Sequence, residues 1–180
     1  MSSKTDEEVA LRVQKGDTDS FGLLIERYEV KLLRYAKRFI FDREDGRDLI
    51  QNVFLKAYVN IKSFDVGRKF SSWIYRIAHN EFVNEIKRRS KFQFFSFESD
   101  IIFPHLVSND EVDTEFERKE LKERLDNYLD KLDVKYREPL ILFYSEDLSY
   151  KEISEILEIP ISTVGVRVQR GRALLRRMIK

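Results

Sequence analysis

A set of side chains that can read DNA lies close to the C-terminus. Between Ser162 and Lys180 the sequence has six basic residues and no acidic one. Helical spacing places Val164 and Val168 on one face of this stretch. The positions on the opposite side are Thr163, Val166, Arg167, Gln169 and Arg170. Because Arg pairs with guanine and Gln with adenine in the major groove, these residue types indicate a DNA-reading helix; the alternative is a solvated basic helix.

Aromatic, basic and amide side chains gather between residues 64 and 89. Aromatic rings stack on nucleobases, basic groups bind phosphates and amides hydrogen-bond to base edges, so this combination is typical of single-stranded DNA binding. Burial of Phe70 and Trp73 in a helical core is an equal alternative. Phe64 is flanked by polar residues in a predicted loop. We therefore expect Phe64 to lie outside the core.

Catalytic and metal-binding chemistry has little support in the sequence. The chain has no cysteine and two histidines, His79 and His105, and neither histidine belongs to a spacing that holds a metal. No glycine-rich phosphate loop or nucleophile motif is present, and the acidic side chains pair with basic ones at helical spacing. We expect no enzymatic activity, no cofactor and no metal.

Charge is distributed unevenly along the chain. The net charge is only +1, but residues 1–90 carry +4, residues 91–115 carry −5, residues 116–147 carry −2 and residues 148–180 carry +4. Two basic ends therefore flank an acidic middle, a distribution that indicates nucleic-acid binding where the overall charge does not. No signal-peptide pattern and no apolar run long enough to span a bilayer occur, which predicts a soluble, cytoplasmic protein.

The first half of the chain has helical periodicity. Apolar residues recur at helical spacing over residues 5–15, from Asp19 or Ser20 to Phe39, from Leu49 to Ile61 and roughly over residues 71–89. A capping box of Thr5 and Glu8 begins the first of these helices, and residues 45–48 lead into the third. No strand-like alternation appears, so residues 1–90 are predicted to form a domain of four to five helices.

Helical spacing returns after residue 114 and ends in a helix-turn-helix pattern. Ser149 and Glu152 form a second capping box, and Pro160 ends the short helix that they begin. Ser162 or Thr163 is predicted to cap the last helix. Two helices joined by a tight turn, the second with a polar outer face, are typical of a DNA-binding helix-turn-helix.

The predicted fold class is therefore all-α, with two small helical domains. The second domain is expected to span residues 115–180 and to contain four helices. Residues 91–114 lack helical periodicity and are acidic and rich in phenylalanine, so we interpret them as an extended linker that becomes ordered on binding. The alternative is a strand or loop packed on one domain, because FQFFSF alternates as a strand would.

Three stretches in series resemble the extracytoplasmic-function (ECF) group of bacterial sigma factors. They are residues 48–58 (DLIQNVFLKAY), residues 70–80 (FSSWIYRIAHN) and the helix-turn-helix of residues 148–177. Their order and spacing cover nearly the whole chain. The resemblance implies an alternative sigma factor that binds core RNA polymerase, recognises −10 and −35 promoter elements and helps to melt the promoter.

The resemblance also implies roles for individual residues. The first domain would dock on the clamp coiled coil of core polymerase, and the matching positions are Asp48, Gln51, Asn52, Phe54 and Leu55. It would also hold a base flipped out of the non-template strand. The −10 positions, taken with the aromatic segment described above, are Lys56, Phe64, Trp73, Arg76 and Asn80. The second domain would read the −35 duplex with the five exposed positions of its last helix.

Further partners follow from the same resemblance. The second domain would also contact the flap of the polymerase, and the acidic linker would pass through the RNA-exit path. An anti-sigma factor would cover these surfaces and could hold the protein at the membrane. Promoter DNA, as duplex and as the non-template single strand, is the expected nucleic acid, and no small-molecule substrate is expected.

Four positions depart from the family pattern. Asn52 and Asn84 stand where acidic residues are common, and Gly165 and Val166 replace the usual Lys and Ser or Thr. The clamp contact at Asn52 is expected to be weaker. Because Val166 can contact a thymine methyl group but cannot hydrogen-bond to a base, we expect an altered −35 preference.

Two other functions stay open at this point. A helix-turn-helix repressor or activator would explain residues 148–180 but would leave residues 64–89 without a role. A protein-interaction adaptor would use the basic faces to bind acidic proteins. Comigration with core polymerase separates a sigma factor from the first alternative, and discrimination between promoter sequences separates it from the second.

Overall fold

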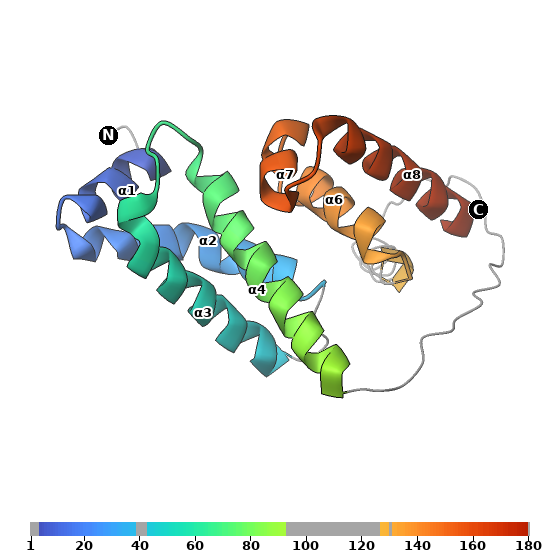
Figure 1. Cartoon of the computed structure of the whole chain (residues 1–180), viewed down its shortest axis with the longest axis horizontal. Helices are drawn as coiled ribbons and strands as arrows, with labels where there is room; N and C mark the ends of the chain where they lie inside the picture. Colours follow the sequence, from blue (N-terminus) through green and yellow to red (C-terminus); the bar gives the residue numbers. More distant parts are fainter. Residues whose placement is uncertain (1–3, 39–42, 93–126, 130, 180) are drawn as a thin grey trace, which may run out of the picture. The chain divides into compact units, whose positions relative to one another are not determined.

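Helices form all of the regular secondary structure of the described residues, which are 4–38, 43–92, 127–129 and 131–179 of a computed structural model (Figure 1). The first unit contains α1 (Asp6–Gln14), η1 (Thr18–Ser20), α2 (Phe21–Ala36), α3 (Arg43–Asn60), η2 (Ile61–Ser63) and α4 (Phe70–Phe92). The second contains α6 (Val134–Tyr144), α8 (Ile161–Ile179) and most of α7 (Tyr150–Leu157). The predicted all-α class with two helical units is confirmed.

An aromatic core joins α2 to α4 in the first unit. The Tyr35 ring of α2 lies 4.9 Å from that of Phe82 and 5.4 Å from that of Tyr75, measured between ring centroids. Tyr28 of α2 packs edge-on against Phe70, with centroids 5.4 Å apart. Edge-to-face pairs add favourable ring electrostatics to the burial of large apolar surfaces. The core therefore fixes α4 against α2, and α3 packs on both helices.

Close packing of α6 against α8 builds the second unit. A β-carbon at Gly171 of α8 would lie 2.7 Å from Cδ1 of Leu140 and 3.2 Å from the carbonyl oxygen of Tyr136. Only glycine allows the two helices to approach this closely. Other buried residues of this unit include Ile141, Leu142, Ile153, Ile156, Val164 and Val168.

Helix starts were predicted less well than helix existence. Residues 45–48 were expected to precede a helix, but α3 already begins at Arg43, since acidic residues are favourable in a first helical turn. Ser162 or Thr163 was expected to cap the last helix, but α8 begins at Ile161 and the Val164 amide donates to the Pro160 carbonyl at 3.1 Å. The predicted linker lies outside the described residues, apart from the last turn of α4.

Candidate nucleic-acid and protein interfaces

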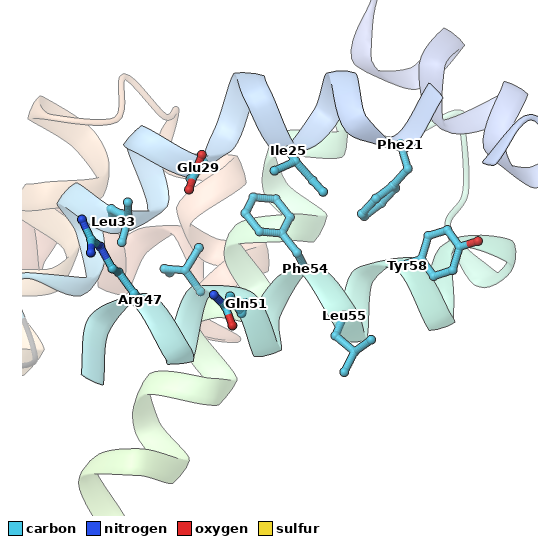
Figure 2. Close-up of a pocket in the computed structure, with 10 residues that line it drawn as sticks. Phe21, Ile25, Glu29, Leu33, Arg47, Gln51, Phe54, Leu55 and Tyr58 are labelled. Atoms are coloured by element: carbon cyan, nitrogen blue, oxygen red, sulfur yellow. The ribbon is translucent and has the colours of Figure 1, made fainter. Parts of the chain in front are cut away.

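An apolar groove of about 440 Å³ runs between α2 and α3 (Figure 2). Phe54 of α3 points into it towards Ile25 and Phe21 of α2, and the Phe21 and Tyr58 rings are in edge contact with centroids 5.2 Å apart. Further lining residues are Glu29, Leu33, Arg47, Ile50, Gln51 and Leu55. Apolar walls with charged groups near one end can accept an amphipathic helix from a partner.

The groove contains three of the five docking positions expected from the sequence. Gln51 and Leu55 line it from exposed positions, and Leu55 is 61% exposed. Phe54 also lines the groove but is only 7% exposed, so it is a core residue that presents one edge. Asp48 and Asn52 are exposed on α3 and do not line the groove.

A second groove, also of about 440 Å³, lies between α3 and α4. Its lining residues are Lys56, Asn60, Ile77, Asn80, Glu81, Val83, Asn84 and Lys87. Two of the expected −10 residues, Lys56 and Asn80, therefore meet in one groove. Within it, Lys56 Nζ lies 2.5 Å from Oε1 of Glu81, whose side chain is 13% exposed. Part of the positive charge of Lys56 is thus already balanced by the protein.

The aromatic candidates lie elsewhere, and the expectation for Phe64 is wrong. Phe64 is 5% exposed, with its ring 5.4 Å from Phe70 and 5.1 Å from Trp73. A polar loop can still turn one aromatic ring inwards when neighbouring helices supply an aromatic pocket. Phe70 is fully buried, Trp73 is partly exposed, and Arg76 is exposed one helical turn before Asn80. The buried Phe64 ring is not available for stacking on a base in this structure.

The expected DNA-reading face of α8 has the predicted orientation. Val164 and Val168 are at most 2% exposed, so their helical face packs inwards. On the other side, Val166, Gln169 and Arg170 are exposed, while Thr163 and Arg167 are partly exposed. All five side chains can therefore reach a ligand. This part of the prediction rested on helical periodicity alone.

Local hydrogen bonds hold both ends of α7, the helix that precedes α8. Ser149 and Glu152 form the predicted capping box, with Ser149 N donating to Glu152 Oε2 at 2.8 Å and Glu152 N donating to Ser149 Oγ at 3.3 Å. The Ser154 hydroxyl donates to the Ile159 carbonyl at 2.6 Å. Glu158 takes a left-handed conformation with φ of 54°. The Ser154–Ile159 hydrogen bond and the left-handed Glu158 end α7 and shape the turn that leads into α8.

Two features of these sites were missed in the sequence. The α2 wall of the apolar groove was seen only as a helix face, because periodicity does not separate residues that pack in a core from residues that line a groove. Glu81 was not singled out, although its position next to Asn80 on α4 was a signal for it. In the part of the chain that the structure describes, no cluster of His, Cys, Asp and Glu can hold a metal ion, and no helix is long and apolar enough to cross a membrane.

Family models and known relatives match most of the chain. Residues 24–92 match the family "Sigma-70 region 2", and residues 122–175 match "Sigma-70, region 4". The chain is 35% identical to the ECF RNA polymerase sigma factor SigW of Bacillus subtilis (strain 168), over 94% of each chain. It is 31% identical to the ECF RNA polymerase sigma-E factor of Haemophilus influenzae, over 98% of this chain and 96% of that one. The structure of CnrH, solved in complex with the cytosolic domain of CnrY, is similar with a TM-score of 0.70 and 27% identity, over 96% of this chain and 95% of that one.

Proposed function

Because the chain belongs to the ECF group of RNA polymerase sigma factors, it directs core polymerase to promoters, and we propose how its surfaces divide that work. The proposed arrangement assigns polymerase docking and the −10 element to residues 1–90, a linker to residues 91–114 and the −35 element to residues 115–180. The observation that carries this division is the location of the two grooves in the first unit and of the basic reading helix in the second.

Docking on the polymerase clamp is assigned to the groove between α2 and α3 and to the exposed face of α3 beside it. The apolar groove provides hydrophobic contact area, and Gln51, Asn52 and Asp48 supply polar contacts along the exposed side of α3. Interface affinity usually depends on a few apolar anchors surrounded by a polar rim. Leu55, which is exposed and lines the groove, is such an anchor.

A matched pair of substitutions tests this assignment. Leu55→Asp should lower the affinity for core polymerase roughly tenfold or more, which is about 1.4 kcal/mol. Val30→Asp is the control, because Val30 is 70% exposed on α2 but does not line the groove and lies away from the docking face of α3. Neither substitution should change the thermal unfolding midpoint. Affinity would be measured by titrating labelled core polymerase, and equal losses for the two variants would contradict the assignment.

Recognition of the −10 strand is assigned to the groove between α3 and α4 and to the adjoining face of α4. Asn80 can hydrogen-bond to a base edge, while Lys56 and Arg76 can contact phosphates. Trp73 keeps a partly exposed ring that can stack on a base. Phe64 supports this site from within the core instead of contacting DNA directly, since its ring packs against Trp73 at 5.1 Å.

Recognition of the −35 duplex is assigned to α8. Arg167, Gln169 and Arg170 carry the groups that distinguish base pairs in the major groove, and Val166 is exposed to contact a thymine methyl group. Run-off transcription with purified core polymerase on a promoter library tests the whole proposal. A preferred promoter with two separated elements is expected, and binding of duplex DNA by the free chain with no effect of polymerase would point to a repressor.

The remaining partners belong to the same proposal. A contact of the second unit with the polymerase flap and passage of the linker through the RNA-exit path complete the docking. CnrH was solved with the cytosolic domain of CnrY, which supports a protein partner for this chain, and we propose that this partner is an anti-sigma factor. The protein would then act in the cytoplasm, alone or held at the membrane by that partner, and would perform no catalysis itself.

A further inference from the structure

Helix α1 holds the segment that leads into α4, over residues 61–70. The side-chain amide of Gln14, at the end of α1, donates to the Ile61 carbonyl at 2.8 Å and to the Phe64 carbonyl at 2.7 Å. A Gln amide nitrogen has two hydrogens, so both of its donors are used on this one segment. The two carbonyl groups belong to the first residue of η2 and to Phe64, whose side chain is buried.

The other end of the segment is held from the same helix. An oxygen of Glu7, Oε1, accepts a hydrogen bond from the backbone N–H of Phe70 at 3.0 Å. Phe70 is the first residue of α4, where backbone N–H groups have no partner within the helix. A carboxylate at this position also complements the positive end of the helix dipole. Gln14 and Glu7 are two helical turns apart, so they project from one side of α1.

Helix α1 is itself fixed against the rest of the first unit. Val9, Ala10 and Val13 are at most 5% exposed. Asp6 accepts a hydrogen bond from the Tyr28 hydroxyl at 2.6 Å and forms an ion pair with Arg27 at 2.5 Å. Both partners belong to α2, so α1 cannot shift without breaking contacts to the body of the unit.

We propose that α1 is a brace for the −10 site, with Gln14 and Glu7 as positioning residues that set the 61–70 segment and through it the rings of Phe64 and Trp73. The proposal rests on the assignment of the −10 strand to the α4 face. Residues 6–14 precede the stretch that matches region 2, which starts at residue 24. The brace therefore adds a function to a helix outside that stretch.

Spectroscopy of the full chain tests whether Gln14 sets the position of the Trp73 ring. Trp73 is the only tryptophan of the sequence, so intrinsic fluorescence reports on the ring that packs against Phe64. Gln14→Glu removes both donors and places a carboxylate against two carbonyl groups. We expect this variant to show a red-shifted emission and stronger quenching by acrylamide than the wild type. Gln14→Lys keeps N–H donors of similar reach and should restore the wild-type emission.

Transcription tests whether the position of these rings matters for the −10 site. With core polymerase and a promoter selected from the library, Gln14→Glu should lose about fivefold in run-off product on fully duplex template, equivalent to the net value of about one hydrogen bond. On a template already melted around −10 the loss should be within about twofold, because the strand no longer has to be captured from duplex. Arg12→Ala is the control, since Arg12 is exposed on α1 between Glu7 and Gln14, and its replacement leaves the cap of α1 and both contacts to residues 61–70 in place.

The outcomes separate the brace from simpler explanations. Unchanged Trp73 emission in Gln14→Glu, or an equal loss of product on both templates, would overturn the proposal, and so would an Arg12→Ala variant with the same pattern as Gln14→Glu. If the wild-type chain gives no transcript with core polymerase, the proposed function fails instead, and the fluorescence series still decides whether α1 sets the segment.

Discussion

Two glycines six residues apart in α8 have different surroundings and should respond differently to the same change. A methyl group at Gly165 would meet the Tyr150 ring at 3.6 Å, an ordinary contact, whereas at Gly171 it would meet Leu140 at 2.7 Å. Gly165→Ala should therefore stabilise the protein by up to ~1 kcal/mol through helix propensity. Gly171→Ala should destabilise it by about 1–3 kcal/mol through overpacking. Denaturant unfolding measures both, and equal signs would contradict the close approach of α6 and α8.

The ion pair between Lys56 and Glu81 leads to a second prediction for individual residues. Replacing Glu81 by Gln should release Lys56 for a phosphate contact and strengthen binding of a −10 single strand to the polymerase-bound chain. One additional phosphate contact should steepen the dependence of log affinity on log salt by about 0.7. Glu85→Gln is the matched control, because Glu85 pairs with Arg88 on the same helix and does not line the groove. The same slope for both variants would count against a DNA role for the groove.

Individual side chains were predicted correctly where periodicity alone decides their direction. Val164 and Val168 face inwards because helical spacing leaves no alternative once α8 packs on α6. Phe64 was predicted wrongly, since its neighbours in the sequence are polar and its burial depends on rings supplied by α4. Tertiary neighbours from elsewhere in the chain cannot be inferred from local sequence.

At the scale of the element, the N-cap of α6 couples stability to pH. Asp133 caps this helix by accepting from Lys135 N at 2.9 Å, and its other oxygen lies 3.0 Å from Lys135 Nζ. Burial raises the pKa of Asp133, but the hydrogen bonds from Lys135 outweigh this effect and hold the pKa below its ordinary value. The stabilisation is therefore complete above the ordinary Asp pKa of about 3.9 and is lost as pH falls through the lower, folded value.

Two variants separate the charge of Asp133 from its capping role. Asp133→Asn keeps a capping oxygen, so its unfolding free energy should converge with that of the wild type as pH drops below about 4. Asp133→Ala removes the cap and should cost about 1 kcal/mol at neutral pH. Urea unfolding at a series of pH values measures the difference. A wild-type advantage that persists unchanged at the acid end would contradict the lowered pKa.

The presence of most helices could be predicted from the sequence, but the residues at which some of them start could not. Both capping boxes were found because a hydroxyl and an acid three residues apart form a local pattern. The start of α8 was missed because Pro160 was taken only as the end of α7. A proline whose carbonyl accepts the first helical hydrogen bonds can end one helix and begin the next.

At the scale of the whole molecule, three sequence stretches in series predicted an ECF sigma factor. The comparisons with known proteins confirm that family. The uneven charge distribution supported the prediction of nucleic-acid binding, whereas the net charge of +1 did not. The sequence did not reveal the role of α1, because Gln14 and Glu7 contact residues 47 to 63 positions away in the chain. Contacts at that separation depend on the folded arrangement of all four helices.

The two units should contribute independently to promoter binding by the assembled polymerase. Asn80 belongs to the first unit and Arg170 to the second, and the two residues are assigned to different promoter elements. Substituting each by Ala should weaken promoter binding by about 1–3 kcal/mol. If the two sites share no packing or hydrogen-bond network, the double variant should lose the sum within about 0.5 kcal/mol. The measurement is the equilibrium binding of one promoter by four polymerase holoenzymes, which contain the wild type, each single variant and the double variant. A double loss well below the sum would mean that both residues act on a single step.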